Sequence, residues 1–305
     1  MNKKYLIGFI LIVLIVFSIL IIENQRPAPE QSGKLKVAAS FYPLYFFAQQ
    51  IGGDKAEIIN ITPAGAEPHD YEPTAQDMTQ IENSRLLILN GGGLEAWGDN
   101  IKQNLNPQKT VVVTVGDGLT NQQVTEDGKT ITDPHIWQSP FLAEQIAGRI
   151  ANGFMQIDPE NKNYYQANAD SLKNKLSNLD KEYGQGLSNC QNKNIITSHA
   201  AFGYLATAYG LNQVPISGLS PDAEPSPQQL ADIVKFAKAN DVKYIFFESL
   251  TSPKLSQTIA TEIGAKTLVL NPIEGLTEEQ LAQGDNYFTE MENNLNNLQT
   301  ALQCK

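Results

Sequence analysis

Histidine is scarce in this chain, and its three copies stand in similar surroundings. His69, His135 and His199 are the only histidines among 305 residues, and they lie in the segments AEPHDYEP, DPHIW and TSHAAFGY. Neutral imidazole is the commonest metal ligand in proteins, and three imidazoles with one carboxylate make a tetrahedral set suited to zinc. A single histidine in such a loop is more often a structural hydrogen-bonding residue, so the interpretation depends on whether the three converge.

Short apolar runs alternate with helical patterns in the first half of the chain. The runs KLKVAAS, AEIINIT, RLLILN and KTVVVTV are typical of strands, and helices are expected around residues 44–51 and 76–82 between the first three. This alternation predicts βαβ units and a mostly parallel sheet that is buried on both faces. The first lobe is expected to cover residues 34–157.

One long helix is predicted over residues 158–188. Asp158 would cap it and Pro159 would take its first position. Apolar residues then recur at spacings of three and four, namely Tyr165, Ala169, Leu172, Leu176, Leu179, Tyr183 and Leu187. A helix of about 30 residues reaches roughly 45 Å, which suits a connection between two lobes.

The alternation resumes in a second lobe, which is expected to cover residues 189–305. The runs NIITS, QVPIS, VKYIFFES and AKTLVLN predict strands separated by helices, and a last helix is expected over residues 278–302. The predicted fold class is therefore α/β, with two similar parallel-sheet lobes joined by one long rigid helix. Ligands of such sheets bind beyond the carboxyl ends of the strands, so a site is expected in the cleft between the lobes.

The candidate ligands agree with this rule. His69 follows the second predicted strand, and His199 follows NIITS almost at once. Glu274, in LNPIEGL, comes shortly after the last strand. His135 lies further on, past the insertion VGDGLTNQQVTEDGKTITDPH and just before a predicted helix. The histidines are separated by roughly 65 residues and form no short metal motif, so spacing alone is weak evidence.

Charge and the N-terminus narrow the classes of function. With 33 acidic and 22 basic residues the net charge is −11, which disfavours nucleic acid and attracts cations. After two lysines, residues 5–22 are uncharged and as a helix would reach about 27 Å. A retained membrane anchor over residues 1–22 is favoured over a cleaved signal, followed by a linker over 23–33, which places the lobes outside the cytoplasm.

The two cysteines, Cys190 and Cys304, are predicted to form one disulfide in an oxidising compartment, with two unrelated thiols as the alternative.

A combination of segments gives a specific resemblance. PAGAEPHDYEPTAQD, DPHIWQSP, ITSHAAFGYLATAYGL, ISGLSPDAEPSP and LVLNPIEGLT, in this order, resemble the substrate-binding proteins of zinc and manganese ABC importers, the metal-binding cluster A-I family of the zinc type. The resemblance implies a metal held between two lobes by His69, His135, His199 and a carboxylate. Glu274 is the preferred fourth ligand and Glu67 is the alternative.

Glu248, which also follows a predicted strand, is expected either to orient a ligand or to compete as the fourth one. Asp70 and Glu72 are either partners of the imidazoles or solvated charges.

The resemblance also implies a function. A histidine at position 199 favours Zn²⁺ over Mn²⁺, because manganese prefers more carboxylate oxygen. The protein would bind zinc outside the cytoplasm and deliver it to an ABC permease driven by a cytoplasmic ATPase, since the chain itself has no GxxxxGK[ST] motif.

Alternative functions are a manganese- or iron-type binding protein, a zinc hydrolase or an adhesin. A fourth protein ligand would leave no position for a catalytic water, so the protein is expected not to be an enzyme. Two features depart from the family pattern: the loop NQQVTEDGKTIT has no histidine, and no cysteine near residue 20 offers a lipid anchor.

Overall fold

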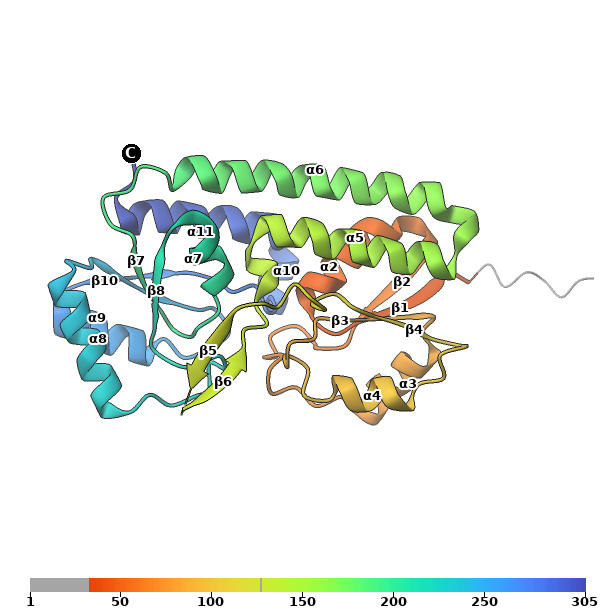
Figure 1. The fold of residues 1–305 in the computed structure, drawn as a ribbon, viewed down its shortest axis with the longest axis horizontal. Coiled ribbons are helices and arrows are strands. Elements are labelled where there is room, and N and C mark those ends of the chain that lie inside the picture. The colour runs from red at the N-terminus through yellow and green to blue at the C-terminus, as the bar shows by residue number, and fades with distance from the viewer. Residues whose placement is uncertain (1–32, 127) are drawn as a thin grey trace, which may run out of the picture. The chain divides into compact units, whose positions relative to one another are not determined.

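The structure is a computed structural model, and it describes residues 33–126 and 128–305. Residues Leu35–Lys305 form one compact unit with two sheets and a small hairpin (Figure 1). The predicted membrane anchor and most of the linker lie outside the described residues. Within the described ranges, no helix is both long and apolar enough to cross a bilayer.

The first sheet is parallel and has the strand order β2-β1-β3-β4. Its strands are β1 (Leu35–Ala39), β2 (Ala56–Asn60), β3 (Leu86–Leu89) and β4 (Val111–Thr114). Both faces are covered by α2 (Tyr42–Gly52), the turn η1 (Gly53–Lys55), α3 (Ala75–Asn83), α4 (Gly98–Asn104) and α5 (Pro140–Ile157).

Alternate residues of β1 belong to different apolar clusters: Val37 and Ala39 pack with α2 and α5, whereas Ala38 packs with α3 and α4. This explains the continuous apolar runs in the sequence.

The second sheet repeats this topology. Its strands are β7 (Asn194–Thr197), β8 (Asn212–Pro215), β9 (Tyr244–Phe247) and β10 (Lys266–Val269). They are parallel in the order β10-β9-β7-β8, so the first strand of each sheet pairs with its second and third, and the fourth lies beyond the third. The predicted pair of similar parallel-sheet lobes is confirmed.

The helices of the second lobe are α7 (Gly203–Tyr209), α8 (Pro227–Ala239), α9 (Lys254–Ile263), α10 (Glu278–Gln283) and α11 (Tyr287–Leu302). The single helix predicted over residues 278–302 is wrong, because α10 ends at Gly284, whose positive φ of 90° reverses the chain. Asn286 then begins α11 by capping it with its side chain.

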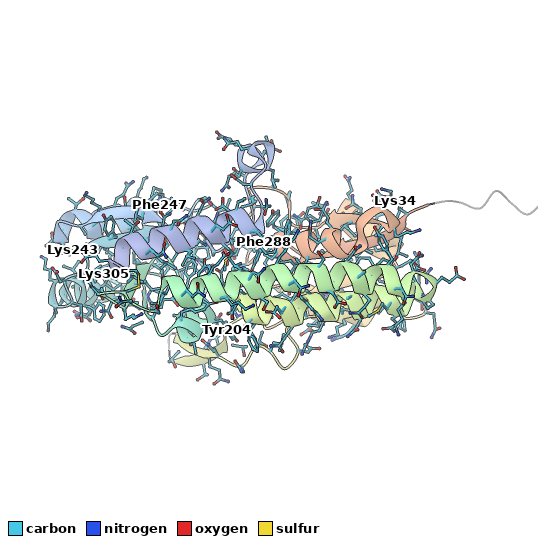
Figure 2. The ribbon with its side chains drawn as sticks, turned by 90° about the horizontal axis from the view of Figure 1, so that it is seen from above. Lys34, Tyr204, Lys243, Phe247, Phe288 and Lys305 are labelled. Carbon is cyan, nitrogen blue, oxygen red and sulfur yellow. A yellow bond between two sulfur atoms is a disulfide. The ribbon has the colours of Figure 1, made fainter. Side chains whose placement is uncertain are left out.

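A long helix, α6 (Lys162–Gly186), follows a 3-10 turn, η3 (Pro159–Asn161). Asp158 does not cap the backbone as predicted; its carboxylate accepts hydrogen bonds from Asn161 and Tyr165 instead. The expected apolar stripe is buried, and it packs on α2 and α5 of the first lobe and on α11 of the second. The hydroxyl of Tyr183 donates to the main-chain oxygen of Met291 at 2.7 Å. Figures 1 and 2 show α6 running along both lobes.

The predicted insertion before His135 contains an antiparallel hairpin, β5 (Gln123–Glu126) and β6 (Lys129–Thr132). No clear strand pattern marks this segment in the sequence, because the hairpin is short and polar. Its base contacts the second lobe, because Gln122 N donates to the Tyr204 hydroxyl at 3.1 Å and that hydroxyl donates to Asp133 O at 3.1 Å. Tyr204, labelled in Figure 2, lies on helix α7 (Gly203–Tyr209) of the second lobe.

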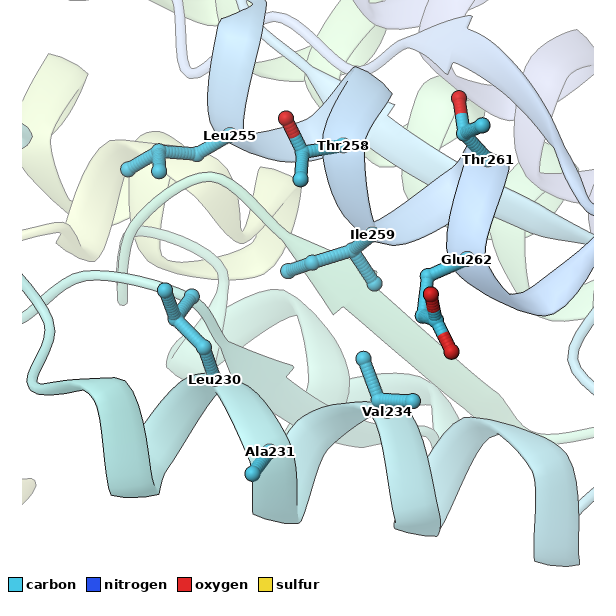
Figure 3. A pocket seen from close by; sticks show the side chains of 8 residues that line it. All are labelled: Leu230, Ala231, Val234, Leu255, Thr258, Ile259, Thr261 and Glu262. Carbon is cyan, nitrogen blue, oxygen red and sulfur yellow. The ribbon is translucent and has the colours of Figure 1, made fainter.

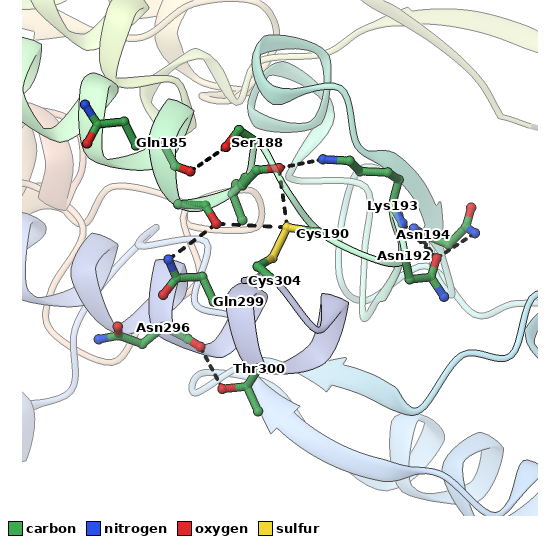
Figure 4. The surroundings of a disulfide bond; sticks show 12 residues. Gln185, Ser188, Cys190, Asn192, Lys193, Asn194, Asn296, Gln299, Thr300 and Cys304 are labelled. Carbon is green, nitrogen blue, oxygen red and sulfur yellow. Dashed lines mark hydrogen bonds between the residues drawn. A yellow bond between two sulfur atoms is a disulfide. The ribbon is translucent and has the colours of Figure 1, made fainter.

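Cys190 and Cys304 form the predicted disulfide (Figure 4). A main-chain hydrogen bond next to the disulfide joins the same two segments: Lys305 N donates to Asn189 O at 3.1 Å. The C-terminus of α11 is thereby joined to the segment that follows α6.

A cavity of about 710 Å³ lies between α8 and α9 in the second lobe (Figure 3). Leu230, Val234, Leu255 and Ile259 line it, so its wall is largely apolar. None of the candidate metal ligands belongs to this cavity.

Candidate metal centre

The candidate ligands come from loops that follow strands of both sheets. In the first lobe, His69 follows β2, and His135 follows β4 and the hairpin. In the second lobe, His199 follows β7 and Glu274 follows β10. The loops of His69, His199 and Glu274 leave the carboxyl ends of parallel strands, and the segment after the hairpin adds His135, so each lobe supplies two of the side chains.

One atom of each side chain points to a common centre. Nε2 of His69 lies 3.2 Å from Nε2 of His135 and 3.3 Å from Oε1 of Glu274. The same carboxylate oxygen lies 3.0 Å from Nε2 of His135 and 3.3 Å from Nε2 of His199. All four side chains can offer ligand atoms within 4.8 Å of one another.

These separations fit a small tetrahedral ion. Ligand atoms held about 2.0–2.1 Å from a tetrahedral zinc ion lie about 3.3–3.4 Å from one another. The four measured separations, between 3.0 and 3.3 Å, are close to this edge length. Three imidazole nitrogens and one carboxylate oxygen also form a donor set that zinc prefers.

The centre is buried and contains polar atoms without partners. His135 and His199 are fully buried and Glu274 is 1% exposed, whereas His69 keeps a side-chain exposure of 10%. Within residues 33–126 and 128–305, neither Nε2 of His199 nor Oε2 of Glu274 makes a hydrogen bond. Leaving such atoms unpaired in the interior is costly, and a metal ion at the centre would use Nε2 of His199 as a ligand.

Two of the imidazoles are fixed by carboxylates on their far side. Oδ1 of Asp133 lies 2.8 Å from Nδ1 of His135 and accepts from its main-chain N–H at 2.9 Å. Oε1 of Glu248 lies 2.7 Å from Nδ1 of His199 and accepts from its main-chain N–H at 3.2 Å. An acceptor at Nδ1 holds the proton there and leaves Nε2 free for a metal.

Sequence reasoning identified Glu248 as one of two alternatives, an orienting acid or a fourth ligand, and its geometry fits the orienting role. It missed Asp133, although the adjacent histidine in DPH was a usable signal. The carboxylates suggested as partners, Asp70 and Glu72, do not contact Nδ1 of an imidazole in the described part of the chain.

The ionisable side chains of the cluster shift one another's pKa values. Burial lowers the pKa of His69. Burial acts in the same direction on His135 and His199, but the carboxylates of Asp133, Glu248 and Glu274 outweigh it, so the pKa of both imidazoles is raised. Burial would raise the pKa of Glu274. The charge of His199 and the contacts with the imidazoles, those of His135 and His69 among them, outweigh burial and hold that pKa well below its usual value. Without a metal, the centre therefore holds protons that zinc must displace.

Glu67, the alternative fourth ligand, lies beside the centre. Its Oε1 accepts from the main-chain N–H of His69 at 3.2 Å. Burial and the charge of Glu274 raise the pKa of Glu67 to about 9, so this carboxyl is protonated at neutral pH. Glu67 also lines a cavity of about 720 Å³, with Ser198 and Asp222 from the second lobe. The geometry thus favours Glu274 as the fourth ligand and leaves Glu67 between the centre and this cavity.

Comparison with known proteins agrees with this chemistry. Residues 37–301 match the family described as "Zinc-uptake complex component A periplasmic". The chain belongs to this family.

Relatives and solved structures of the zinc-uptake family cover most of the chain. The high-affinity zinc uptake system protein ZnuA of Bacillus subtilis (strain 168) is 39% identical over 289 residues, covering 91% of each chain. The zinc-binding lipoprotein AdcA of Streptococcus pneumoniae (strain R6) is 39% identical over 283 residues, covering 89% of this chain and 56% of AdcA. The chain therefore spans just over half of that longer relative.

The crystal structure of the Zn(II)-bound ZnuA-like domain of S. pneumoniae AdcA superposes with a TM-score of 0.76 at 39% identity, covering 88% of this chain and 99% of that one.

Proposed function

We propose that His69, His135, His199 and Glu274 bind one zinc ion, and that the chain captures zinc outside the cytoplasm for uptake. The observation that carries this proposal is the convergence of three Nε2 atoms and one Oε1 atom, all within 4.8 Å of one another and with four separations between 3.0 and 3.3 Å. The family is that of a zinc-uptake complex, and zinc is named as the bound metal or cargo of the relatives.

The same relationship determines the class of protein. Members of a zinc-uptake family carry the metal and do not transform it, so the chain is a metal-binding protein and not an enzyme. The family description places the protein on the extracytoplasmic side. Attachment through residues 5–22 remains a prediction from the sequence.

The family description, a component of a zinc-uptake complex, implies the kind of partner. A binding protein without a nucleotide site needs a membrane permease to move the ion and an ATPase to drive it. We expect the ion to leave when the two lobes separate, because each lobe supplies two of the four ligands. Since α6 is packed against both lobes, the movement is expected to be smaller than in clefts with flexible hinges.

The test is the metal content and zinc affinity of the full-length chain beside His199→Ala and Glu274→Ala. Each variant removes one ligand, so we expect one zinc ion per wild-type chain and at least tenfold weaker binding in both variants, as for other metal sites whose shell is disturbed.

Glu262→Ala is the matched control, because this carboxylate is 62% exposed and pairs with Lys238, away from the candidate ligands. Unchanged affinity in Glu274→Ala, or equal affinity for manganese, would contradict the ligand set or the choice of metal.

A further inference from the structure

The loop that carries Glu274 has an unusual backbone. Ile273, the residue before Glu274, has a φ of 57° and is fully buried. A left-handed conformation is a genuine outlier for a β-branched side chain, because Cβ crowds the following carbonyl oxygen. Residues in such conformations persist only where the surrounding structure holds them, and they gather at functional sites.

A pair of asparagines holds this loop from the C-terminal helix. Oδ1 of Asn294, on α11, accepts from Asn271 N at 2.8 Å, and its Nδ2 donates to Asn271 O at 2.7 Å. The side chain of Asn271 in turn accepts from Ile273 N at 2.8 Å and donates to Oε2 of Glu290 at 2.8 Å. Both asparagines are 1% exposed, so water does not compete for these bonds.

The first lobe holds the same loop from the opposite side. Nε1 of Trp137 donates to the main-chain oxygen of Pro272 at 2.8 Å, and Nε2 of Gln138 donates to the same oxygen. These two residues follow His135 in the 3-10 turn η2 (Ile136–Gln138). The residues just before Glu274 are therefore fixed by hydrogen bonds from both lobes.

We infer that Asn271 and Asn294 are positioning residues for the fourth ligand. Asn294 fixes the main chain of Asn271 through two hydrogen bonds, and Oδ1 of Asn271 accepts from the N–H of Ile273. Together they hold Ile273 in the left-handed conformation, which places Oε1 of Glu274 beside the three imidazoles. This inference rests on the proposed function, because it assigns a role to residues that act only through Glu274.

The test is a double-mutant cycle on the full-length chain, with zinc affinity measured by competition with a chromophoric chelator. Asn294→Leu removes both bonds to Asn271 at similar volume, and we expect zinc to bind about 10–100-fold more weakly. If Asn294 acts through Glu274, the double variant Asn294→Leu/Glu274→Ala binds zinc as Glu274→Ala does, whereas independent effects would multiply. The visible spectrum of the cobalt-loaded protein should change in Asn294→Leu, because one ligand of the ion is displaced.

Asn297→Leu is the matched control. Asn297 lies on the same helix and donates to Val269 O at 2.9 Å, so its loss removes a similar bond to β10 and not to the loop. We expect this variant to keep the zinc affinity and the cobalt spectrum of the wild type.

The outcomes separate the two proposals. If Glu274→Ala weakens zinc binding but Asn294→Leu does not, or if the two effects multiply, the positioning role is wrong and the ligand set stands. If Glu274→Ala changes nothing, both fail. Should Asn294→Leu not fold, Asn294→Ala replaces it in the cycle, because it also removes both bonds to Asn271 and adds no charge.

Discussion

Glu248→Gln is the most informative single change at the metal centre. The carboxylate is 3% exposed, and its Oε1 lies 2.7 Å from Nδ1 of His199. Glutamine keeps an oxygen acceptor at this place but removes a negative charge beside the imidazole. Partners of metal ligands typically contribute 10–100-fold in affinity, which is about 1.4–2.7 kcal/mol. Because the acceptor remains, we expect about tenfold weaker zinc binding at alkaline pH.

The loss should depend on pH in a defined direction. Glu248 is the leading cause that raises the pKa of His199, so the variant lowers that pKa and fewer protons compete with zinc in acid. The affinity gap between variant and wild type is therefore expected to be widest near pH 8 and to narrow towards pH 6. Competition titrations across this range measure both effects.

Glu262→Gln, at the exposed pair with Lys238, makes the same chemical change in the same lobe. It should leave both the zinc affinity and its dependence on pH unaltered. A gap that is constant with pH, or no gap near pH 8, would refute the reasoning.

Three further outcomes follow from the structure. Zinc affinity of the wild type should fall on acidification, and the fall should begin above pH 6.5, because the carboxylates raise the pKa of His135 and His199; equal affinities at about pH 5 and 8 would contradict this. Cys304→Ser should lower the free energy of unfolding by about 2–4 kcal/mol in denaturant titrations while zinc affinity is retained, because the disulfide closes a long loop and no cysteine is among the ligands. Gly116→Ala should destabilise the first lobe by about 1–3 kcal/mol, since its Cβ would clash with the main-chain oxygen of Asn90; an unchanged melting temperature would contradict this.

The sequence was sufficient where one physical signal dominated. Apolar runs such as RLLILN predicted buried parallel strands, and the spacing from Tyr165 to Tyr183 predicted the buried stripe of α6. His69, His199 and Glu274 could be placed because each lies just beyond a predicted strand, and ligands bind beyond the carboxyl ends of such strands, whereas His135 lies past an insertion and was included because of the resemblance.

Other features depended on contacts between distant segments. The hairpin over residues 123–132 is short and polar, and its place is fixed by contacts such as that between Gln122 and Tyr204. The break at Gly284 depends on a positive φ. An isolated glycine in a helical pattern is also compatible with a continuous helix, so the break could not be predicted from its presence. The left-handed Ile273 could not be predicted, because local preference opposes it and only the tertiary hydrogen bonds impose it.

The division of the ligands between the lobes has a consequence for thermodynamics. Each lobe alone would offer a bidentate half-site, and α6 tethers the two halves at a high effective concentration. Tight binding by the proposed ligand set would then be a chelate effect, and the bound ion would link the lobes, so its binding free energy would also stabilise the contact between them. A partner that pulls the lobes apart does not need to compete for zinc with stronger ligands. Such a partner needs only to lower that effective concentration. The ion would then be bound by two ligands of one lobe, and it would dissociate more easily.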